Sequence, residues 1–210
     1  MPRIAEDRAP AEPSSAEQHE RYQRILVAAA RLAAESGYER VQMHEVAKAA
    51  GVAIATLYRY FPSKAHLFTA VMRWQVSRGY SAPSSGSAQD PAGAIADLLI
   101  SMTRQMVRSP LLSLAMMQAN NKTQALASAA GEQSPNDVAF QQLVLDTAGI
   151  AEPSTEDDRR VRLVVHCWYG VLTSVLNGRI PMEEAEDDVR VACRLLVDSE
   201  YPRAEERSSR

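Results

Sequence analysis

The residues best suited to contact another molecule lie in one run of nine, TLYRYFPSK, from Thr56 to Lys64. Lysine and arginine can neutralise phosphates, and hydroxyl and guanidinium groups can hydrogen-bond to base edges, so this run suits DNA recognition. A short helix that turned Leu57 and Phe61 inward would turn a polar and aromatic face outward. The outward side chains would then be Thr56, Tyr58, Arg59 and Tyr60. Exposed aromatic rings are unfavourable in water unless a partner covers them, which favours a binding surface.

Two short helices separated by a glycine are predicted to position this run. The first, 43–50, repeats apolar residues at helical spacing and stops at Gly51. The second, 54–60, ends before Pro62, because proline cannot donate the backbone hydrogen bond of a continuing helix. A helix-turn-helix of this size is used to place the second helix in the DNA major groove. Two-helix hairpins also occur inside bundles, so the geometry alone leaves a buried hairpin open.

Helical periodicity extends over most of the remaining chain and predicts an all-α protein. Glycine, proline and capping residues mark the ends of the helices. Further helices are predicted at 18–36, 64–79, 91 to a break at Ser109-Pro110, 135–148, 155–176 and 181–199, with a methionine-rich segment after the break and an ambiguous polar stretch at 120–133. The stretch 81–91, SAPSSGSAQDP, has turn-forming residues at most positions and is predicted to be a linker.

Charge is distributed unevenly along the chain. Residues 21–80 hold nine basic and three acidic residues, a net charge of +6, within a protein whose formal charge is −3. Residues 81–210 hold 12 basic and 18 acidic residues. A basic segment inside an acidic protein predicts that this segment meets a polyanion while the rest serves another purpose.

The sequence lacks the residues that several classes of function require. The longest central run without a charged residue, 163–178, has 16 residues, fewer than the roughly 20 of a membrane span. The N-terminus has no apolar segment of a secretory signal, so we expect a cytoplasmic protein that does not enter the membrane. Neither Cys167 and Cys193 nor the four histidines have metal-ligand spacing, and His166 and Cys167 are interpreted as core residues rather than a catalytic pair. Nucleotide-binding and nucleophile motifs are absent, so we predict no cofactor, no metal and no enzyme activity.

The run YQRILVAAARLAAESGYERVQMHEVAKAAGVAIATLYRYFPSKAHLFTAVM resembles the DNA-binding domain of TetR-family transcriptional regulators over residues 20–72. The resemblance implies a homodimer that reads a near-palindromic operator in double-stranded DNA and is released by a small molecule. The family's groove-facing positions fall on His44, Ala55, Thr56, Tyr58, Arg59 and Tyr60, with Lys64 as a phosphate anchor. Ala53 and Ile54 depart from the capping and polar residues that the family often has there, so the resemblance does not extend to base contacts at the helix start.

Within the family, the segments VQMHEVA, RSPLLSLAM and VVHCWYGVL resemble actinobacterial regulators of steroid and acyl-CoA catabolism. This resemblance implies a large hydrophobic small-molecule effector, such as a sterol-derived or fatty acyl thioester. Methionine and aromatic side chains adapt to irregular ligands, although methionine at helical spacing also packs cores. The predicted ligand-binding residues are Met102, Met106, Leu112, Met116, Met117, Trp168 and Tyr169.

The last two predicted helices carry an apolar stripe that is too wide for a single contact within the chain. We expect a second copy to cover it, which would form a four-helix interface and set two recognition helices about 34 Å apart. Completion of the monomer core is the alternative. The predicted dimer-interface residues are Val161, Val165, Leu172, Val175, Val189, Ala192 and Leu196.

These inferences divide the chain into four parts. We predict a disordered tail at 1–19, a three-helix helix-turn-helix DNA-binding domain at 20–66, a larger helical ligand-binding and dimerisation domain at 67–200, and a C-terminal tail at 201–210. A small helical enzyme or acyl carrier without specific DNA binding is the alternative from another class. A regulator of the same fold that activates transcription, or that responds to a drug-like cation, is a further alternative.

Overall fold

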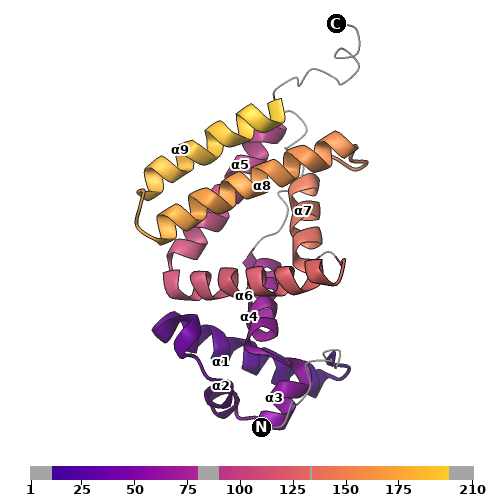
Figure 1. Cartoon of the computed structure of the whole chain (residues 1–210), viewed down its shortest axis with the longest axis vertical. Coiled ribbons are helices and arrows are strands. Elements are labelled where there is room, and N and C mark those ends of the chain that lie inside the picture. Colours follow the sequence, from indigo (N-terminus) through magenta and orange to yellow (C-terminus); the bar gives the residue numbers. More distant parts are fainter. Residues whose placement is uncertain (1–10, 80–89, 133, 199–210) are drawn as a thin grey trace, which may run out of the picture. The chain divides into compact units, whose positions relative to one another are not determined.

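The computed structural model describes residues 11–79, 90–132 and 134–198. Every regular element in these ranges is a helix, as the all-α prediction stated (Figure 1). The elements are α1 (Ala16–Arg40), α2 (Met43–Ala50), α3 (Ile54–Tyr60), α4 (Lys64–Gly79), α5 (Pro91–Val107), α6 (Pro110–Ala129), α7 (Pro135–Ala148), α8 (Thr155–Leu176), α9 (Met182–Cys193) and a final π-helical turn (Arg194–Asp198). None of the described helices has the length and apolar content to cross a membrane.

The chain folds into two compact units. Unit 1 comprises residues 1–81 and 105–139, and unit 2 comprises residues 82–104 and 140–210. The boundaries fall inside α5, between Arg104 and Gln105, and inside α7, between Ala139 and Phe140. Two continuous helices therefore each contribute residues to both units.

Unit 1 has a core formed by α1, α4 and α6, with α2 and α3 packed against α1 and against each other. Ile25 of α1, Phe68 of α4 and Ala119 of α6 are completely buried in this core. The side chain of Asn136 donates a hydrogen bond of 3.1 Å to the side chain of Asn120, and both residues are buried. This pairing explains why α6 continues through the polar stretch that was ambiguous in the sequence, because a buried amide is stable only when it is hydrogen-bonded.

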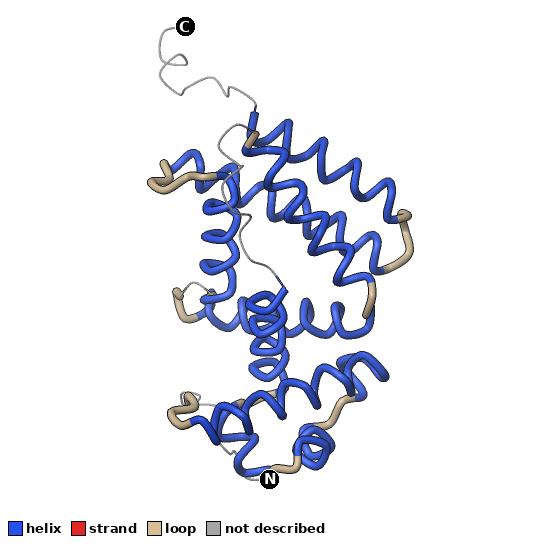
Figure 2. The backbone as a smooth tube through the Cα atoms, turned by 180° about the vertical axis from the view of Figure 1, so that it is seen from behind, coloured by secondary structure: helices blue, strands red, loops and turns tan. Residues whose placement is uncertain are grey.

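Unit 2 is built around the hairpin of α8 and α9, which lie side by side and antiparallel (Figure 2). Arg160 near the start of α8 donates to the carbonyl of Val197 at 3.1 Å, which fixes the register of the hairpin at the end away from its turn. The α8 helix begins at a capping box, in which Ser154 and Asp157 hydrogen-bond to each other's backbone. The Ser154 hydroxyl and, to a lesser extent, its backbone N–H donate to the Asp157 carboxylate and lower its pKa.

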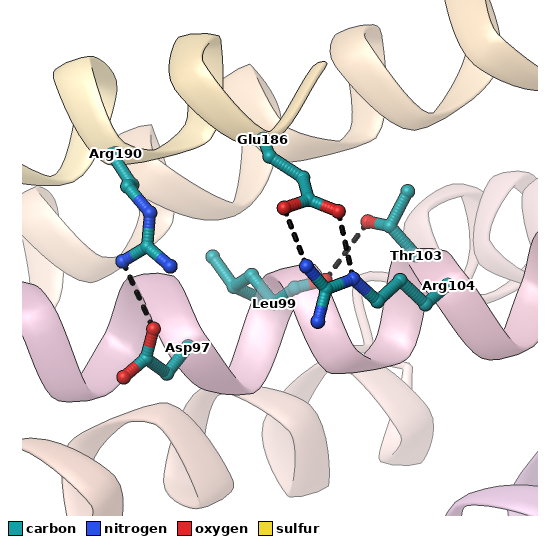
Figure 3. Close-up of polar contacts among 6 residues, drawn as sticks. All are labelled: Asp97, Leu99, Thr103, Arg104, Glu186 and Arg190. Carbon is teal, nitrogen blue, oxygen red and sulfur yellow. Dashed lines mark hydrogen bonds and ion pairs between the residues drawn. The ribbon is translucent and has the colours of Figure 1, made fainter. Parts of the chain in front are cut away.

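One side of α9 is joined to α5 by two ion pairs (Figure 3). Arg104 donates to both carboxylate oxygens of Glu186 at 2.7 and 2.5 Å, and this contact lowers the pKa of the Glu186 carboxyl. Arg190 donates to Asp97 at 2.9 Å, one to two turns away along the same pair of helices. The two pairs hold α5 alongside α9.

The helix bounds differ from the predictions mainly at the chain ends. Helix α1 begins at Ala16, inside the stretch predicted as tail, because Ser15 caps it by accepting from the backbone of Gln18. It continues past the predicted end at residue 36 to Arg40, with a kink at Gly37, where φ is 76°. The predicted last helix divides into α9 and the π-helical turn. The predicted linker, except for its last two residues, and the C-terminal tail lie outside the described residues.

Candidate nucleic-acid interface and regulatory unit

A tight turn fixes α3 against α2. Gly51 has φ 65°, a left-handed conformation that glycine adopts without strain, and its N–H donates to the carbonyls of Ala47 and Lys48. The next residue, Val52, donates to Ala47 at 3.0 Å. At the other end of α2, Glu45 accepts from the backbone of Gln42. The predicted bounds of α2 and α3 are confirmed, and the helix-turn-helix holds α3 rigidly.

The inner face of α3 is anchored by a cluster of aromatic rings. Tyr60 and Phe61 are 2% exposed, and both contact the ring of Tyr22 on α1, with centroid distances of 5.5 and 4.8 Å. Burial raises the pKa of the Tyr22 hydroxyl. The prediction that Tyr60 points outward is wrong, because Tyr60 lies three residues after the buried Leu57 and therefore on the same helical face.

The outer face of α3 is open. Ala55, Tyr58 and Arg59 are exposed and Thr56 is half-buried, as is expected of side chains that reach into a groove. His44 on α2 is exposed as well. The predicted set omitted Ile54, which is 41% exposed and lies one turn before Tyr58 on the same face. Ile54 could have been included because it is an apolar residue at the first position of the predicted recognition helix.

The conformation of Arg59 is constrained from two sides. Its guanidinium donates to the hydroxyl of Tyr60 at 3.2 Å and lies over that ring, 5.0 Å from the centroid. Its carbonyl accepts from the backbone N–H of Ala11 at 3.0 Å, so the segment that precedes α1 lies across the end of α3. The buried Tyr60 therefore orients the exposed Arg59.

Lys64, the predicted phosphate anchor, makes several contacts within the chain. Its ammonium donates to three backbone carbonyls, those of Tyr38 at 2.8 Å and of Glu39 and Val41 at 3.3 Å. It also lies 4.4 Å from the centroid of the Tyr38 ring. These carbonyls lie at the negative end of the α1 dipole, where a positive charge is stabilised, and the phosphate contact of Lys64 stays a prediction. In this fold Lys64 is a cap for the end of α1.

Two family models match the chain in sequence. Residues 25–71 match the model of bacterial regulatory proteins of the tetR family, and residues 88–196 match the model of the tetracyclin repressor-like C-terminal domain. The chain belongs to the TetR family. Members of this family bind operator DNA and small-molecule effectors, and the family consists of transcription regulators rather than enzymes.

Curated relatives cover most of this TetR-family chain. It is 34% identical over 186 residues to the HTH-type transcriptional repressor KstR of Rhodococcus jostii, which covers 88% of this chain and 86% of the relative. It is 33% identical over 191 residues to KstR of Mycobacterium tuberculosis, which covers 90% of this chain and 86% of the relative. The protein is thus a TetR-like DNA-binding transcriptional regulator related to KstR.

Solved structures share the fold. A TetR transcriptional regulator from Rhodococcus sp. RHA1 superposes with a TM-score of 0.78 at 48% identity, over 88% of this chain and all of that one. FadR of Thermus thermophilus, a TetR-family repressor crystallised with lauroyl-CoA, superposes with a TM-score of 0.53 at 20% identity, over 87% of this chain and 96% of that one. The second likeness concerns the fold alone.

The predicted effector residues are divided between the two units. Leu112 and Met116 are buried in the unit 1 core with α1 and α4. Met106 and Met117 also belong to unit 1, whereas Met102, Trp168 and Tyr169 belong to unit 2. The structure therefore does not bring the seven residues together within one unit.

Among the predicted effector residues of unit 2, Trp168 makes side-chain contacts with two other helices. Its indole N–H donates to the hydroxyl of Thr103 on α5 at 2.9 Å, and Thr103 in turn donates to the carbonyl of Leu99. Its ring lies 5.3 Å from the ring of Phe140 on α7. One large side chain on α8 thus bridges α5 and α7, and all its polar capacity is satisfied within the chain.

Three of the seven residues of the predicted dimer stripe are already buried within the chain. Val161, Leu172 and Val189 are at most 3% exposed, because they face into unit 2, so the prediction that a second copy covers them is wrong. Val165, Val175, Ala192 and Leu196 are half-buried. The apolar residues that this hairpin does expose are Leu163, Val191 and Leu195, at 44%, 56% and 66%.

The two cysteines lie in different environments. His166 and Cys167 are exposed, so they are not the core pair that the sequence indicated. They share the outer face of α8 with Leu163 and Gly170. Cys193 is buried on α9, and this burial raises the pKa of its thiol to about 12. The Cys193 thiol is therefore protonated at neutral pH.

Proposed function

We propose that this protein is a cytoplasmic, homodimeric transcriptional repressor that binds a near-palindromic operator through α3 and leaves it when a hydrophobic effector binds in unit 2. The observation that carries the proposal is the outer face of α3. Ile54, Tyr58 and Arg59 are exposed on a helix whose other face is fixed by Leu57 and Tyr60. A rigid helix with an open aromatic and cationic face suits direct contact with base edges.

The effector proposed is a sterol-derived or fatty acyl thioester. Its support is the relation to KstR over most of the chain and the interior of unit 2, where Trp168 of α8 contacts Phe140 of α7 and Thr103 of α5. The TetR fold can hold a long acyl chain, since FadR was crystallised with lauroyl-CoA. An effector that separates α5 or α7 from Trp168 would shift helices that continue into unit 1. The effector need only bind more tightly, by one to three kcal/mol, to the conformation that cannot bind DNA than to the one that can. This difference lowers operator affinity about five- to 150-fold.

Fluorescence-anisotropy binding tests this function directly. The probe is the duplex upstream of the protein's own gene, measured at two salt concentrations with and without a panel of acyl-CoA and steroid-acid thioesters. A repressor that contacts several phosphates loses affinity steeply as salt rises, and the matching thioester releases it. Salt-dependent specific binding that no thioester changes would keep the DNA function and reject the effector class. Absence of specific binding there and in a genome-wide selection would favour an acyl carrier.

Replacing Tyr58 with alanine should weaken operator binding about 10- to 100-fold at every effector concentration, because it removes an exposed contact from the recognition face. Tyr58 is 42% exposed, so the fold should be unchanged. Leu126→Ala is the matched control, since Leu126 is 59% exposed on α6. Anisotropy titration measures both variants, and wild-type affinity in the folded Tyr58 variant would contradict the role of this face.

The dimer surface proposed here is the exposed side of α8 and α9, not the predicted stripe. Leu163 and Val191 supply exposed apolar area there. Gly170 lies two turns after Leu163 on the same side of α8, and a Cβ added to it would meet nothing within 4 Å. A mid-helix glycine costs about 1 kcal/mol relative to alanine, so stability of the single chain gives no reason for it. Close approach of a second helix does give one.

Gly170→Leu should convert the dimer to a monomer at micromolar concentration, because the added side chain occupies the space that the second copy needs. The single chain should lose no stability, since the site is open and leucine favours the helix more than glycine does. Sedimentation velocity measures the change. Ala125→Leu, at an exposed position of α6, adds similar bulk elsewhere and should leave the dimer intact. A dimeric Gly170→Leu protein would place the interface on another surface.

A further inference from the structure

Tyr60 is a buried tyrosine whose hydroxyl contacts an exposed residue. Tyr60 is 2% exposed, and its ring packs edge-on against the ring of Tyr22, with 5.5 Å between the centroids. A phenylalanine would fill the same space, so packing explains the ring but not the hydroxyl. The hydroxyl accepts a hydrogen bond of 3.2 Å from the guanidinium of Arg59. It is therefore placed to act on the side chain of Arg59.

Arg59 is held at its backbone as well as at its side chain. It lies in the last turn of α3, where carbonyls have no partner within the helix. Its carbonyl accepts from the N–H of Ala11 at 3.0 Å, and the N–H of Phe61 donates to the carbonyl of Leu57 at 2.8 Å. The guanidinium lies 5.0 Å from the centroid of the Tyr60 ring, which restricts its position. Both ends of the Arg59 side chain thus have defined partners.

The hydrogen bond to Tyr60 leaves most donors of Arg59 for another molecule. A guanidinium has five N–H donors, and the Tyr60 hydroxyl accepts from one of them. Among the residues that the structure describes, Arg59 forms no ion pair, and neither does Glu12, the exposed acid that follows Ala11. The charge of Arg59 is therefore not neutralised within the described part of the chain.

The neighbours of Arg59 on α3 leave room for a base edge. Ala55 lies one turn before it on the same face, is exposed, and has only a methyl group as its side chain. A helix with a small residue at this position can approach the floor of the groove, while the longer arginine extends to a base. In the major groove the favoured partner of an arginine is guanine, whose O6 and N7 accept two hydrogen bonds.

A guanine edge suits this arginine better than a phosphate does. Phosphate oxygens can be approached from several directions, so a flexible cationic side chain is sufficient for them. The O6 and N7 of guanine lie in one plane and require two donors in a matching plane. A guanidinium that is already held also loses less conformational entropy when it binds. Restriction by Tyr60 is therefore of most use for contact with a base.

We propose that Arg59 recognises a guanine in each half-site of the operator, and that Tyr60 is the positioning residue that holds Arg59 for this contact. The inference rests on the proposed binding of DNA by α3 and names the base that one of its side chains selects. Tyr60 acts through Arg59, because its own ring is buried against Tyr22. Arg59 is then a residue that determines specificity, and the Tyr60 hydroxyl sets how strongly it does so.

Selection of duplexes from a random pool tests the proposal with the full-length protein, whatever the sequence of its operator. The bound duplexes are sequenced, and the preference for each base is measured at each position. The wild type should prefer guanine at one position of each half-site. Arg59→Ala should lower this preference about 5- to 150-fold, the range for loss of one bidentate pair, and leave the other positions unchanged.

Tyr60→Phe keeps the buried ring and removes only the hydroxyl, so it should lower the preference for the same guanine about three- to tenfold. Tyr38→Phe is the matched control, because it removes a hydroxyl from a half-buried tyrosine of α1 whose ring contacts Phe68. It should leave every preference unchanged. Arg59→Lys tests the proposal even if Tyr60→Phe does not fold. It keeps the charge at an exposed position but loses the planar pair of donors, so the guanine preference should fall while the salt dependence of binding stays the same.

Three results would overturn the proposal, each in a different part. Suppose that Arg59→Ala weakens binding to all sequences equally and lowers the slope of log affinity against log salt by about one. Arg59 would then be a phosphate contact. A folded Tyr60→Phe protein with an unchanged guanine preference would remove the positioning role of Tyr60. A wild type that selects no sequence from the pool would overturn the proposed function as well.

Discussion

Replacing Lys64 with methionine should lower the free energy of unfolding of the DNA-binding unit by roughly 2 to 3 kcal/mol. The ammonium donates to the carbonyls of Tyr38, Glu39 and Val41, and hydrogen bonds from a charged donor contribute about 1.5 to 3 kcal/mol where they are sheltered from water. Lys64 is half-buried, so the three bonds together are worth less than three such contributions. Without them the last carbonyls of α1 lose their cap. Urea unfolding, followed by circular dichroism, measures the change.

The same variant separates a structural role from a phosphate contact. If Lys64 caps α1, the Lys64→Met protein at low temperature should bind its operator with an unchanged dependence on salt. If Lys64 neutralises a phosphate in the complex, the slope of log affinity against log salt should fall by about one. Lys48→Met, at an exposed position of α2, is the control for stability. Unchanged stability together with a reduced slope would support the phosphate contact that the sequence predicted.

Trp168→Ala should destabilise unit 2 by about 3 to 5 kcal/mol, because it empties the space between α5, α7 and α8 and removes the aromatic ring that contacts Phe140. Thermal unfolding of the apo protein measures this loss. Trp168→Phe keeps an aromatic ring beside Phe140 and should cost less, so it is the variant for functional work. It should retain operator affinity and change the thioester concentration that releases the DNA.

A double-mutant cycle isolates the hydrogen bond between Trp168 and Thr103. Thr103→Val alone leaves a buried indole N–H without its acceptor, which costs about 1 to 3 kcal/mol. The double variant Thr103→Val and Trp168→Phe removes both partners, so its loss should be smaller than the sum of the single losses. Loss of operator binding by a folded Trp168→Phe protein would contradict the assignment of Trp168 to the effector unit.

Most helices could be predicted from the sequence, because the residues at a helix end largely determine where that helix begins or stops. Gly51 ends α2, Pro62 follows the end of α3, and Pro135 and Gly149 bound α7, each through backbone conformations that the residue itself imposes. The second half of α6 could not be recognised in this way. Its stability comes from Asn120, which is hydrogen-bonded to Asn136 of another helix, and no local pattern records such a partner.

The candidate site was predicted less completely than the fold for a related reason. Pattern analysis identified which residues suit DNA but not which of them the fold already uses. Tyr60 and Lys64 match the chemistry of a contact, yet Tyr22 and the end of α1 engage them within unit 1. The sequence shows an apolar stripe on α8, but it does not show which residues of other helices pack against that stripe. Burial in unit 2 covers Val161 and leaves Leu163 exposed.

The chain has two tryptophans, and the fold places one in each unit. Trp74 is half-buried on α4, where the guanidinium of Arg78 lies 5.1 Å from its ring centroid. Trp168 is buried beside Phe140 and Thr103. Each unit therefore has its own intrinsic fluorophore in a distinct environment. With one of the two replaced by phenylalanine, emission reports the local stability of unit 1 or of unit 2 separately, without any added label.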